Sequence, residues 1–265
     1  MRLKSIRQFN ALLFTLFLAL AAPFPAAASS LSVAADPWCP FNCEPGAEQE
    51  GYAIDAMRII FERAGIQIIY KTLPWDRVLA EVKSGRLDAA VGVYRPEAPD
   101  LIYPEEDMGG SDNGFFVRKD SDWAFTGIES LHGQRLAFIS GYDYGPPFDD
   151  YIAAHPNSPD IVVTTGLAPL TRNFQMLAKS RVDVVIVDIT AGTYFLTKWE
   201  DQAKVRSAGF QGVMDPVFIA FSPAKAQSTR YARILTEGWR ALRASGELAN
   251  ILARYGLTDW KQRTP

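Results

Sequence analysis

The segment Lys83-Ser84-Gly85-Arg86-Leu87-Asp88-Ala89-Ala90-Val91-Gly92-Val93 decides how the chain is built. A helix over residues 75–84 is expected to end at Gly85, and a buried strand over 89–93 follows the basic turn. A similar succession returns at Lys179-Ser180-Arg181-Val182-Asp183-Val184-Val185-Ile186-Val187. This echo fits either a recurrent helix-to-strand connection or a duplicated architecture. Both interpretations place a strand end at the same point of two similar halves.

Short apolar runs and amphipathic stretches alternate on both sides of each copy. Strands are expected over 31–35, 67–72, 89–93, 135–139, 161–164 and 184–187, and helices over 54–64, 75–84, 148–154 and 167–178. Strands that alternate with helices form parallel sheets covered by helices. The sequence therefore predicts an α/β fold of two lobes, each a mostly parallel sheet flanked by helices.

The ends of the chain predict how the two lobes are joined. Residues 114–117 and 217–221 are expected to be two strands that connect the lobes as a hinge, and two helices follow up to Gly256. We expect lobe 1 to hold residues 29–117 plus 217–265, and lobe 2 to hold residues 118–216. Ligands of open α/β sheets bind beyond the carboxyl ends of strands, here at 92–95 and at Asp188, so a cleft between the lobes is expected.

The first 28 residues are typical of a secretory signal. Three basic residues among the first seven precede a short apolar run over 11–22 and an Ala-x-Ala site before Ser29. A membrane anchor is the alternative, but the run is shorter than the ~20 residues that span a bilayer. Because Ser29 rather than cysteine follows the cut, no lipid attachment is expected. We predict a periplasmic protein that begins near Ser29.

Composition narrows the class of partner. The chain has 265 residues, of which 48% are hydrophobic and 22% are charged, and this excludes a disordered protein. Its net charge is -3, which does not favour nucleic acid, so a small molecule is the expected partner. No metal is expected, since His132 and His155 have no ligand spacing to either cysteine.

The two cysteines lie in Trp38-Cys39-Pro40-Phe41-Asn42-Cys43. Pro40 prevents a regular helix, and an oxidising compartment favours a local disulfide between Cys39 and Cys43. So short a loop stabilises little through chain entropy. The expected role of the disulfide is to hold Trp38 and Phe41 in a fixed turn.

Several short motifs follow one another in a specific order along nearly the whole mature chain. They are Ala35-Asp36-Pro37-Trp38 with Pro40-Phe41, Gly51-Tyr52-Ala53-Ile54-Asp55, Pro74-Trp75-Asp76-Arg77, Leu131-His132-Gly133-Gln134-Arg135-Leu136 before Ser140-Gly141, and Gly246-Glu247-Leu248 through Tyr255-Gly256. Together they resemble the bacterial extracellular solute-binding proteins of family 3, the amino-acid-type periplasmic receptors of ABC importers. The resemblance implies a monomer with the type II periplasmic binding protein fold. It also implies importer membrane subunits as partners, no cofactor and no catalysis.

The resemblance also assigns residues to the cleft. Trp38 matches the aromatic position beneath the ligand, and Trp75 lies in the loop that supplies another apolar wall. For both, packing in the core is the alternative. Asp188 matches the second-lobe acid that holds a ligand amino group, and its alternative role is a helix N-cap.

The sequence departs from the family at the carboxylate clamp. Family members carry an arginine shortly after the third strand, where this chain has Ala98 or Pro99. Ordinary α-amino acids are therefore expected to bind poorly. Arg95 either substitutes for that arginine from the same loop or is a solvated surface residue.

The expected ligand site combines aromatic rings with acids. Asp143, in the loop of the second lobe, either joins this site or caps the following helix. The members are Trp38, Tyr52, Trp75, Tyr94, Arg95, Tyr142, Asp143 and Asp188. This set suits an amine or other cation, or a polar ring stacked on the aromatic faces.

Two other functions are compatible with the sequence. One is an enzyme of the dehydratase or lyase type on the same scaffold, which would use an acid such as Glu97, Asp143 or Asp188. The other is a ligand-sensing subunit for a membrane signalling protein.

Overall fold

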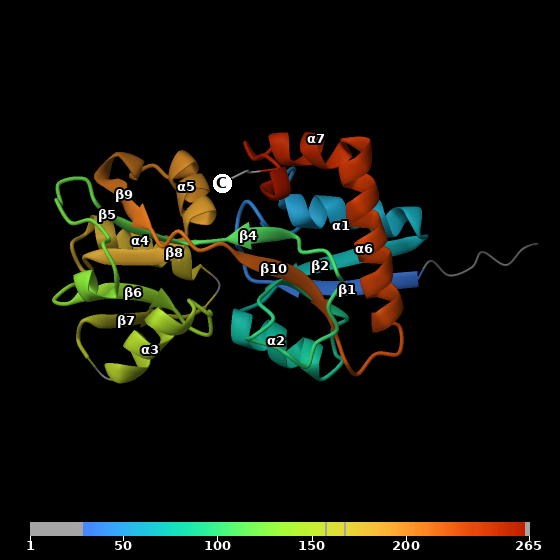
Figure 1. The fold of residues 1–265 in the computed structure, drawn as a ribbon, viewed down its shortest axis with the longest axis horizontal. Helices are drawn as coiled ribbons and strands as arrows, with labels where there is room; N and C mark the ends of the chain where they lie inside the picture. Colours follow the sequence, from blue (N-terminus) through green and yellow to red (C-terminus); the bar gives the residue numbers. More distant parts are fainter. Residues whose placement is uncertain (1–28, 157, 167, 263–265) are drawn as a thin grey trace, which may run out of the picture.

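The computed structural model describes residues 29–156, 158–166 and 168–262, so the expected signal over residues 1–28 lies outside the described residues. The strands form two five-stranded sheets. Each sheet lies in its own lobe, and the lobes stand side by side along the longest axis of the molecule (Figure 1). The expected two-lobe α/β architecture is confirmed.

The first sheet has the strand order β2-β1-β3-β10-β4. Its strands are β1 (Ser29–Ala35), β2 (Ile66–Thr72), β3 (Ala89–Val93), β4 (Gly109–Ser111) and β10 (Asp215–Phe221). The helices of this lobe are α1 (Tyr52–Arg63), α2 (Trp75–Lys83), α6 (Ser228–Ser245) and α7 (Glu247–Ala253). β1 runs parallel to β2 and β3, whereas β10 runs antiparallel to β3 and β4. The sheet is therefore mixed.

The second sheet has the strand order β7-β6-β8-β5-β9. Its strands are β5 (Asn113–Arg118), β6 (Leu136–Ile139), β7 (Ile161–Thr164), β8 (Val184–Asp188) and β9 (Val205–Phe210). The helices of this lobe are α3 (Pro146–Ala154), α4 (Pro169–Ala178) and α5 (Ile189–Lys198). It also has short 3₁₀ turns at Ile128–Leu131 and Gln202–Lys204, and a further one, Trp260–Gln262, follows α7 near the end of the chain. β6 runs parallel to β7 and β8, and β5 runs antiparallel to β8 and β9. The two sheets thus share one plan.

The chain passes between the sheets at two places, Asp112 and residues 211–214. Residues up to 117 are expected in lobe 1, but β5 pairs along its length with strands of the second sheet. The apolar run 114–117 is therefore a buried strand of lobe 2 and not a connecting strand. β10 likewise belongs to the first sheet from Asp215 onward. We propose lobe boundaries that follow the sheets, with residues 113–210 as lobe 2.

The repeated helix-to-strand segment performs the same task in both lobes. Asp88 accepts a hydrogen bond from the backbone N of Ser32 in β1, at 2.8 Å. Asp183 accepts one from the backbone N of Arg135, just before β6, at 3.0 Å. Asp88 therefore ties the turn before β3 to the middle of β1, and Asp183 ties the turn before β8 to the residue that precedes β6. These matching hydrogen bonds give the repeated segment a physical reason.

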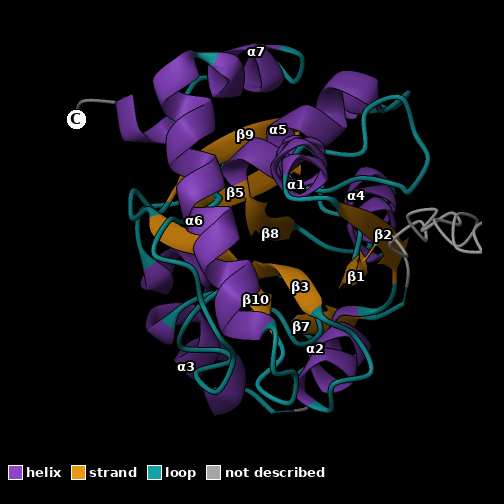
Figure 2. Ribbon diagram, turned by 90° about the vertical axis from the view of Figure 1, so that its right-hand side faces the viewer, coloured by secondary structure: helices purple, strands orange, loops and turns teal. Residues whose placement is uncertain are grey.

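Helices enclose the strands of both sheets (Figure 2). Alternate residues of β1 enter different cores, because successive strand side chains point to opposite faces. Val33 packs in the cluster that contains α1 and α6 side chains, and Ala34 packs in the cluster that contains α2 side chains. Gly238 allows α6 to pack closely against α1, because a Cβ at this position would lie 2.3 Å from Ile60 Cγ2.

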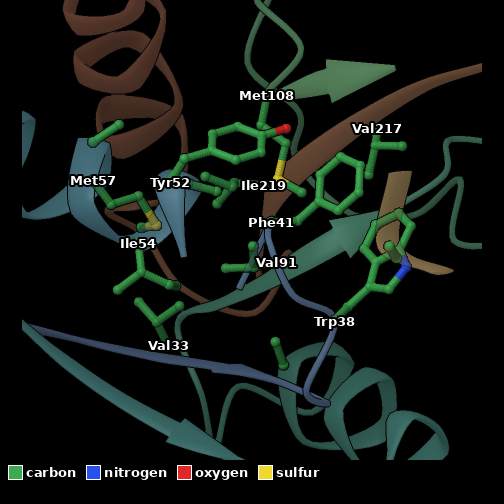
Figure 3. Close-up of a cluster of buried hydrophobic side chains, with 14 of the residues drawn as sticks. Val33, Trp38, Phe41, Tyr52, Ile54, Met57, Val91, Met108, Val217 and Ile219 are labelled. Atoms are coloured by element: carbon green, nitrogen blue, oxygen red, sulfur yellow. The ribbon is translucent and has the colours of Figure 1, made fainter. Parts of the chain in front are cut away.

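The expected disulfide between Cys39 and Cys43 is present, with the two Cα atoms 4.8 Å apart. The loop that it closes holds Trp38 and Phe41 with their rings stacked, 4.1 Å between centroids. Figure 3 shows Phe41 between Trp38 and the core residue Tyr52.

Thiol titration tests this disulfide. Native protein that has never been reduced is expected to show no reactive thiol, and two are expected after denaturation in a reductant. Two thiols titrating in the native, unreduced protein would contradict the bond.

Candidate ligand-binding cleft

A pocket lies between the lobes at the carboxyl ends of the strands, where the sequence places a cleft. It encloses about 450 Å³, counting the space open to solvent. The first lobe contributes Asp36, Trp38, Trp75, Val91, Gly92, Tyr94, Glu97 and Ser111, and the second lobe contributes Asn113, Tyr142, Asp143, Tyr144 and Asp188.

The first lobe supplies two indole rings to the pocket. Trp38 stacks on Phe41 and is 7% exposed. Gly92 lies against it, since a Cβ at Gly92 would be 3.4 Å from the Trp38 ring. The Trp75 indole Nε1 donates to Glu97 Oε1 at 2.5 Å, so this indole holds a carboxyl group in the pocket.

Burial changes the protonation of three acids in the pocket. It raises the pKa of Asp36 and of Asp188 to about 6 and that of Glu97 to about 7. Hydrogen bonds from Tyr142, from the α5 backbone and from Trp75 offset part of this effect. The pKa values of these three acids therefore lie near neutral pH, and a nearby positive charge would favour the ionised forms.

Asp188 is held firmly at the end of β8. Its Oδ1 accepts from the backbone N of Ala191 at 2.7 Å, which caps α5. Its Oδ2 accepts from Ser111 Oγ at 2.8 Å and from the Asp112 backbone N at 3.1 Å. Asp188 is thus an N-cap that also lines the pocket, and it is bonded to the point where the chain crosses between lobes.

The second lobe closes over the pocket through residues 141–144. The Tyr142 hydroxyl donates a hydrogen bond to Asp36 Oδ2 of the first lobe. Asp143 accepts from the Gly145 backbone N at 2.8 Å, so it stabilises the turn before α3 while it lines the pocket. Gly141 lies so close to α2 that a Cβ there would be 2.1 Å from Asp76 Oδ1. The lobes are in contact in this structure.

Tyr52 and Arg95 do not join this pocket. Tyr52 is 2% exposed and packs in the core against Phe41, 5.4 Å between ring centroids. Arg95 lies in a neighbouring cavity, with its guanidinium 4.4 Å from the Phe218 ring centroid and its Nη2 donating to the Pro104 carbonyl at 3.0 Å. The other six expected site residues all line the pocket.

The expected departure from the family clamp has a structural counterpart. Ala98 is buried in the core beside Trp75, and Pro99 is exposed. In the described part of the chain, no lysine, arginine or histidine lines the pocket.

Several pocket residues were not assigned to the ligand site from the sequence. Asp36 follows β1 just as Asp188 ends β8, so the strand-end rule that selects Asp188 applies to it equally. The sequence indicates Glu97 only as an acid that an enzyme on this scaffold would use. Ser111 and Asn113 flank the crossover, and no sequence signal marks them.

The described residues contain no group of three or more side chains placed to hold a metal ion. Within the same residues, no helix has the length and apolarity needed to cross a membrane.

Comparisons with known proteins agree with this geometry. A curated relative, a probable amino-acid ABC transporter-binding protein of Haemophilus influenzae, is 24% identical over 76% of this chain and 74% of its own length. Solved structures with the same fold include a histidine kinase sensor domain similar to periplasmic binding proteins (TM-score 0.71, 21% identity, 85% of this chain and 95% of that one). Another is the arginine-, lysine-, histidine-binding protein ArtJ from Geobacillus stearothermophilus (TM-score 0.72, 15% identity, 89% of this chain and 99% of that one).

The strongest comparison is with a protein family. The model of the bacterial extracellular solute-binding proteins, family 3, matches residues 31–258. The family and the Haemophilus relative are binding proteins, so the chain is a binding protein and not an enzyme. The two-lobe fold, the pocket between the lobes and this match together show that the chain belongs to the bacterial extracellular solute-binding proteins, family 3.

Proposed function

We propose that the chain is a periplasmic receptor that captures a small cationic ligand between its lobes and delivers it to an ABC importer. The observation that carries the ligand class is the charge of the pocket. Four carboxyl groups line it, from Asp36, Glu97, Asp143 and Asp188, and no basic side chain does among the described residues. An amine or guanidinium would offset the cost of burying these acids.

The aromatic walls support the same ligand class. Trp38, Trp75, Tyr94 and Tyr142 are among the residues that line the pocket. A cation over an aromatic face gains about 0.5 to 2 kcal/mol, most when water is excluded. The arginine expected to bind a carboxylate is missing, so ordinary acidic ligands lack a partner.

A thermal-shift screen tests the ligand class. We expect cadaverine, agmatine, lysine derivatives and choline to raise the Tm, and glutamate, succinate and glucose to leave it unchanged. A ligand at one hundred times its Kd stabilises the folded state by about 2.7 kcal/mol, which is a shift of roughly 5 to 10 °C for a chain of this size. Stabilisation by the dicarboxylates or sugars, with none by the cations, would contradict the proposal.

The pH dependence of binding is a second test. A cation pairs with ionised carboxylates, and Asp36, Asp188 and Glu97 have pKa values of about 6, 6 and 7 without a ligand. Below those values a proton must leave before the ion pair forms, so affinity is expected to fall as the pH drops from 8 to 5, by up to about tenfold per pH unit for each such group.

Calorimetry measures this effect directly. Binding of cadaverine at pH 6.5 should release protons, which is detected by comparing buffers with different ionisation enthalpies. A Kd that does not change between pH 5 and 8 would remove these acids from the cation site.

The export route is tested by the mature N-terminus. Protein recovered from the periplasm is expected to begin near Ser29, because the Ala-x-Ala site precedes that residue. Edman sequencing or intact mass spectrometry gives the answer. Retention of residues 1–28 in the exported protein would contradict the assignment.

A further inference from the structure

Two tryptophans line the pocket, and they differ in whether the indole N–H has a hydrogen-bond partner. The Trp75 Nε1 donates to Glu97. The Trp38 Nε1 is buried and has no hydrogen-bond partner. The amide of Asn113, another side-chain N–H donor of the lining, is bonded to the Tyr144 carbonyl and to Gln211 Oε1. Among the side-chain N–H donors of the lining residues, Trp38 alone has no partner within the protein.

The Trp38 ring is fixed in the orientation that leaves its N–H unpaired. It stacks on Phe41, lies against Gly92 and belongs to the loop that the Cys39–Cys43 disulfide closes. Its backbone N donates to the Asn42 carbonyl at 2.7 Å, and its own carbonyl accepts from Phe41 and Asn42. In Figure 3 the indole nitrogen points away from Tyr52. The ring therefore has little freedom to find a partner within the protein.

A buried donor without a partner costs about 1–3 kcal/mol. A ligand atom that accepts this hydrogen bond recovers that energy. Amines and guanidinium groups are donors in their charged forms and accept no hydrogen bond. A ligand that satisfies both the carboxyl groups and Trp38 must therefore carry an acceptor in addition to its cation.

The charge of the pocket decides which acceptor fits. A ligand carboxylate would stand among the carboxyl groups of Asp36, Glu97, Asp143 and Asp188, and no basic side chain is among the described residues that line the pocket. Like charges in one enclosed space oppose each other. A carboxamide avoids this repulsion, since its carbonyl accepts from Trp38 and its N–H groups donate to the surrounding carboxyl oxygens.

We propose that Trp38 selects, among cationic ligands, amines that also carry a neutral amide carbonyl, as amino-acid amides do. This inference rests on the proposed function, because it assumes that a cation occupies the same pocket. It makes Trp38 a specificity-determining residue through its N–H group, in addition to its ring.

Lysinamide, lysine and cadaverine test the proposal, since they differ only in carrying a carboxamide, a carboxylate or neither at one carbon. Calorimetry on the full mature chain is expected to show lysinamide binding about tenfold more tightly than cadaverine. Lysine is expected to bind more weakly than lysinamide. In Trp38→Phe, which keeps a ring but loses the N–H, the preference for lysinamide over cadaverine should fall to about threefold or less.

Trp239→Phe is the matched control. Its indole Nε1 is likewise buried without a partner, but it lies in the core of the first lobe and outside the pocket. That variant should keep the wild-type preference. In ¹⁵N spectra the indole resonance missing from Trp38→Phe should move when lysinamide is added, and much less with cadaverine.

The outcomes separate this inference from the proposed function. If Trp38→Phe weakens lysinamide and cadaverine equally, or if lysine binds more tightly than lysinamide, the selection by Trp38 is wrong while cation binding stands. If none of the three compounds binds at millimolar concentration, the cationic ligand class fails and this inference fails with it.

Discussion

Replacing Gly51 with alanine is expected to destabilise the protein by about 3 kcal/mol or more and to disrupt ligand binding. Gly51 has a φ of 101°, which L residues with a Cβ rarely adopt. A Cβ there would lie 2.4 Å from Asn42 Cα and 2.5 Å from the Phe41 carbonyl oxygen. Both atoms belong to the backbone, so no rotamer change relieves the overlap. The loop that moves is the one that holds Trp38.

Gly46→Ala is the matched control for this variant. Gly46 lies in the same loop, with a φ of 76° and nothing within 4 Å of the position of a Cβ. It carries the backbone strain without the overlap, and about 1 kcal/mol is expected. Urea unfolding followed by circular dichroism compares the two. Equal stability of the two variants would show that the loop yields easily and that its position does not depend on Gly51.

Asp188→Asn is expected to weaken the binding of cadaverine by about 2 to 5 kcal/mol, because a buried cation then loses one of its carboxylate partners. The fold should survive, since asparagine is a good N-cap and its amide oxygen can accept from the Ala191 backbone N. The change also removes a buried acid whose pKa is raised to about 6, but it replaces Oδ2, which accepts from the Asp112 backbone N, by an amide nitrogen that can only donate.

Calorimetry with a parallel thermal melt separates binding from folding in this case. Asp122→Asn serves as the control, because Asp122 is an exposed acid of the same lobe that does not line the pocket. It should bind cadaverine as the wild type does. Unchanged affinity in folded Asp188→Asn would mean that Asp188 acts only as a helix cap.

Local patterns predicted most of the fold. The helix over 75–84, Gly85 and the strand over 89–93 follow from periodicity and a turn residue, and the structure has them as α2 and β3. β4 and β9 were not predicted. β4 is Gly109-Gly110-Ser111, which has no strand propensity of its own, and it is a strand only because it pairs with β10. Pairing between distant segments is not visible in a local pattern.

Residues that line the pocket were predictable where a strand end or a motif marked them. Asp188 and Trp38 are such positions, and both line the pocket. Tyr52 shows the limit of this reasoning, because the side of α1 on which an aromatic ring at the helix start lies depends on how Gly51 turns the chain. Arg95 shows another limit. Its guanidinium lies over the rings of Tyr103 and Phe218, and these two residues are far from each other in the sequence.

The strand order also sets the order in which the lobes can be completed. All strands of the second sheet come from residues 113–210, a continuous stretch. The first sheet needs β10 between β3 and β4, and α6 after it, so the position between these two strands stays unfilled until residues 215–245 are available. Long-range pairings of this kind form late, because the intervening chain must first be ordered. A chain that emerges from its N-terminus can therefore complete the second sheet before the first, although the first sheet begins earlier in the sequence.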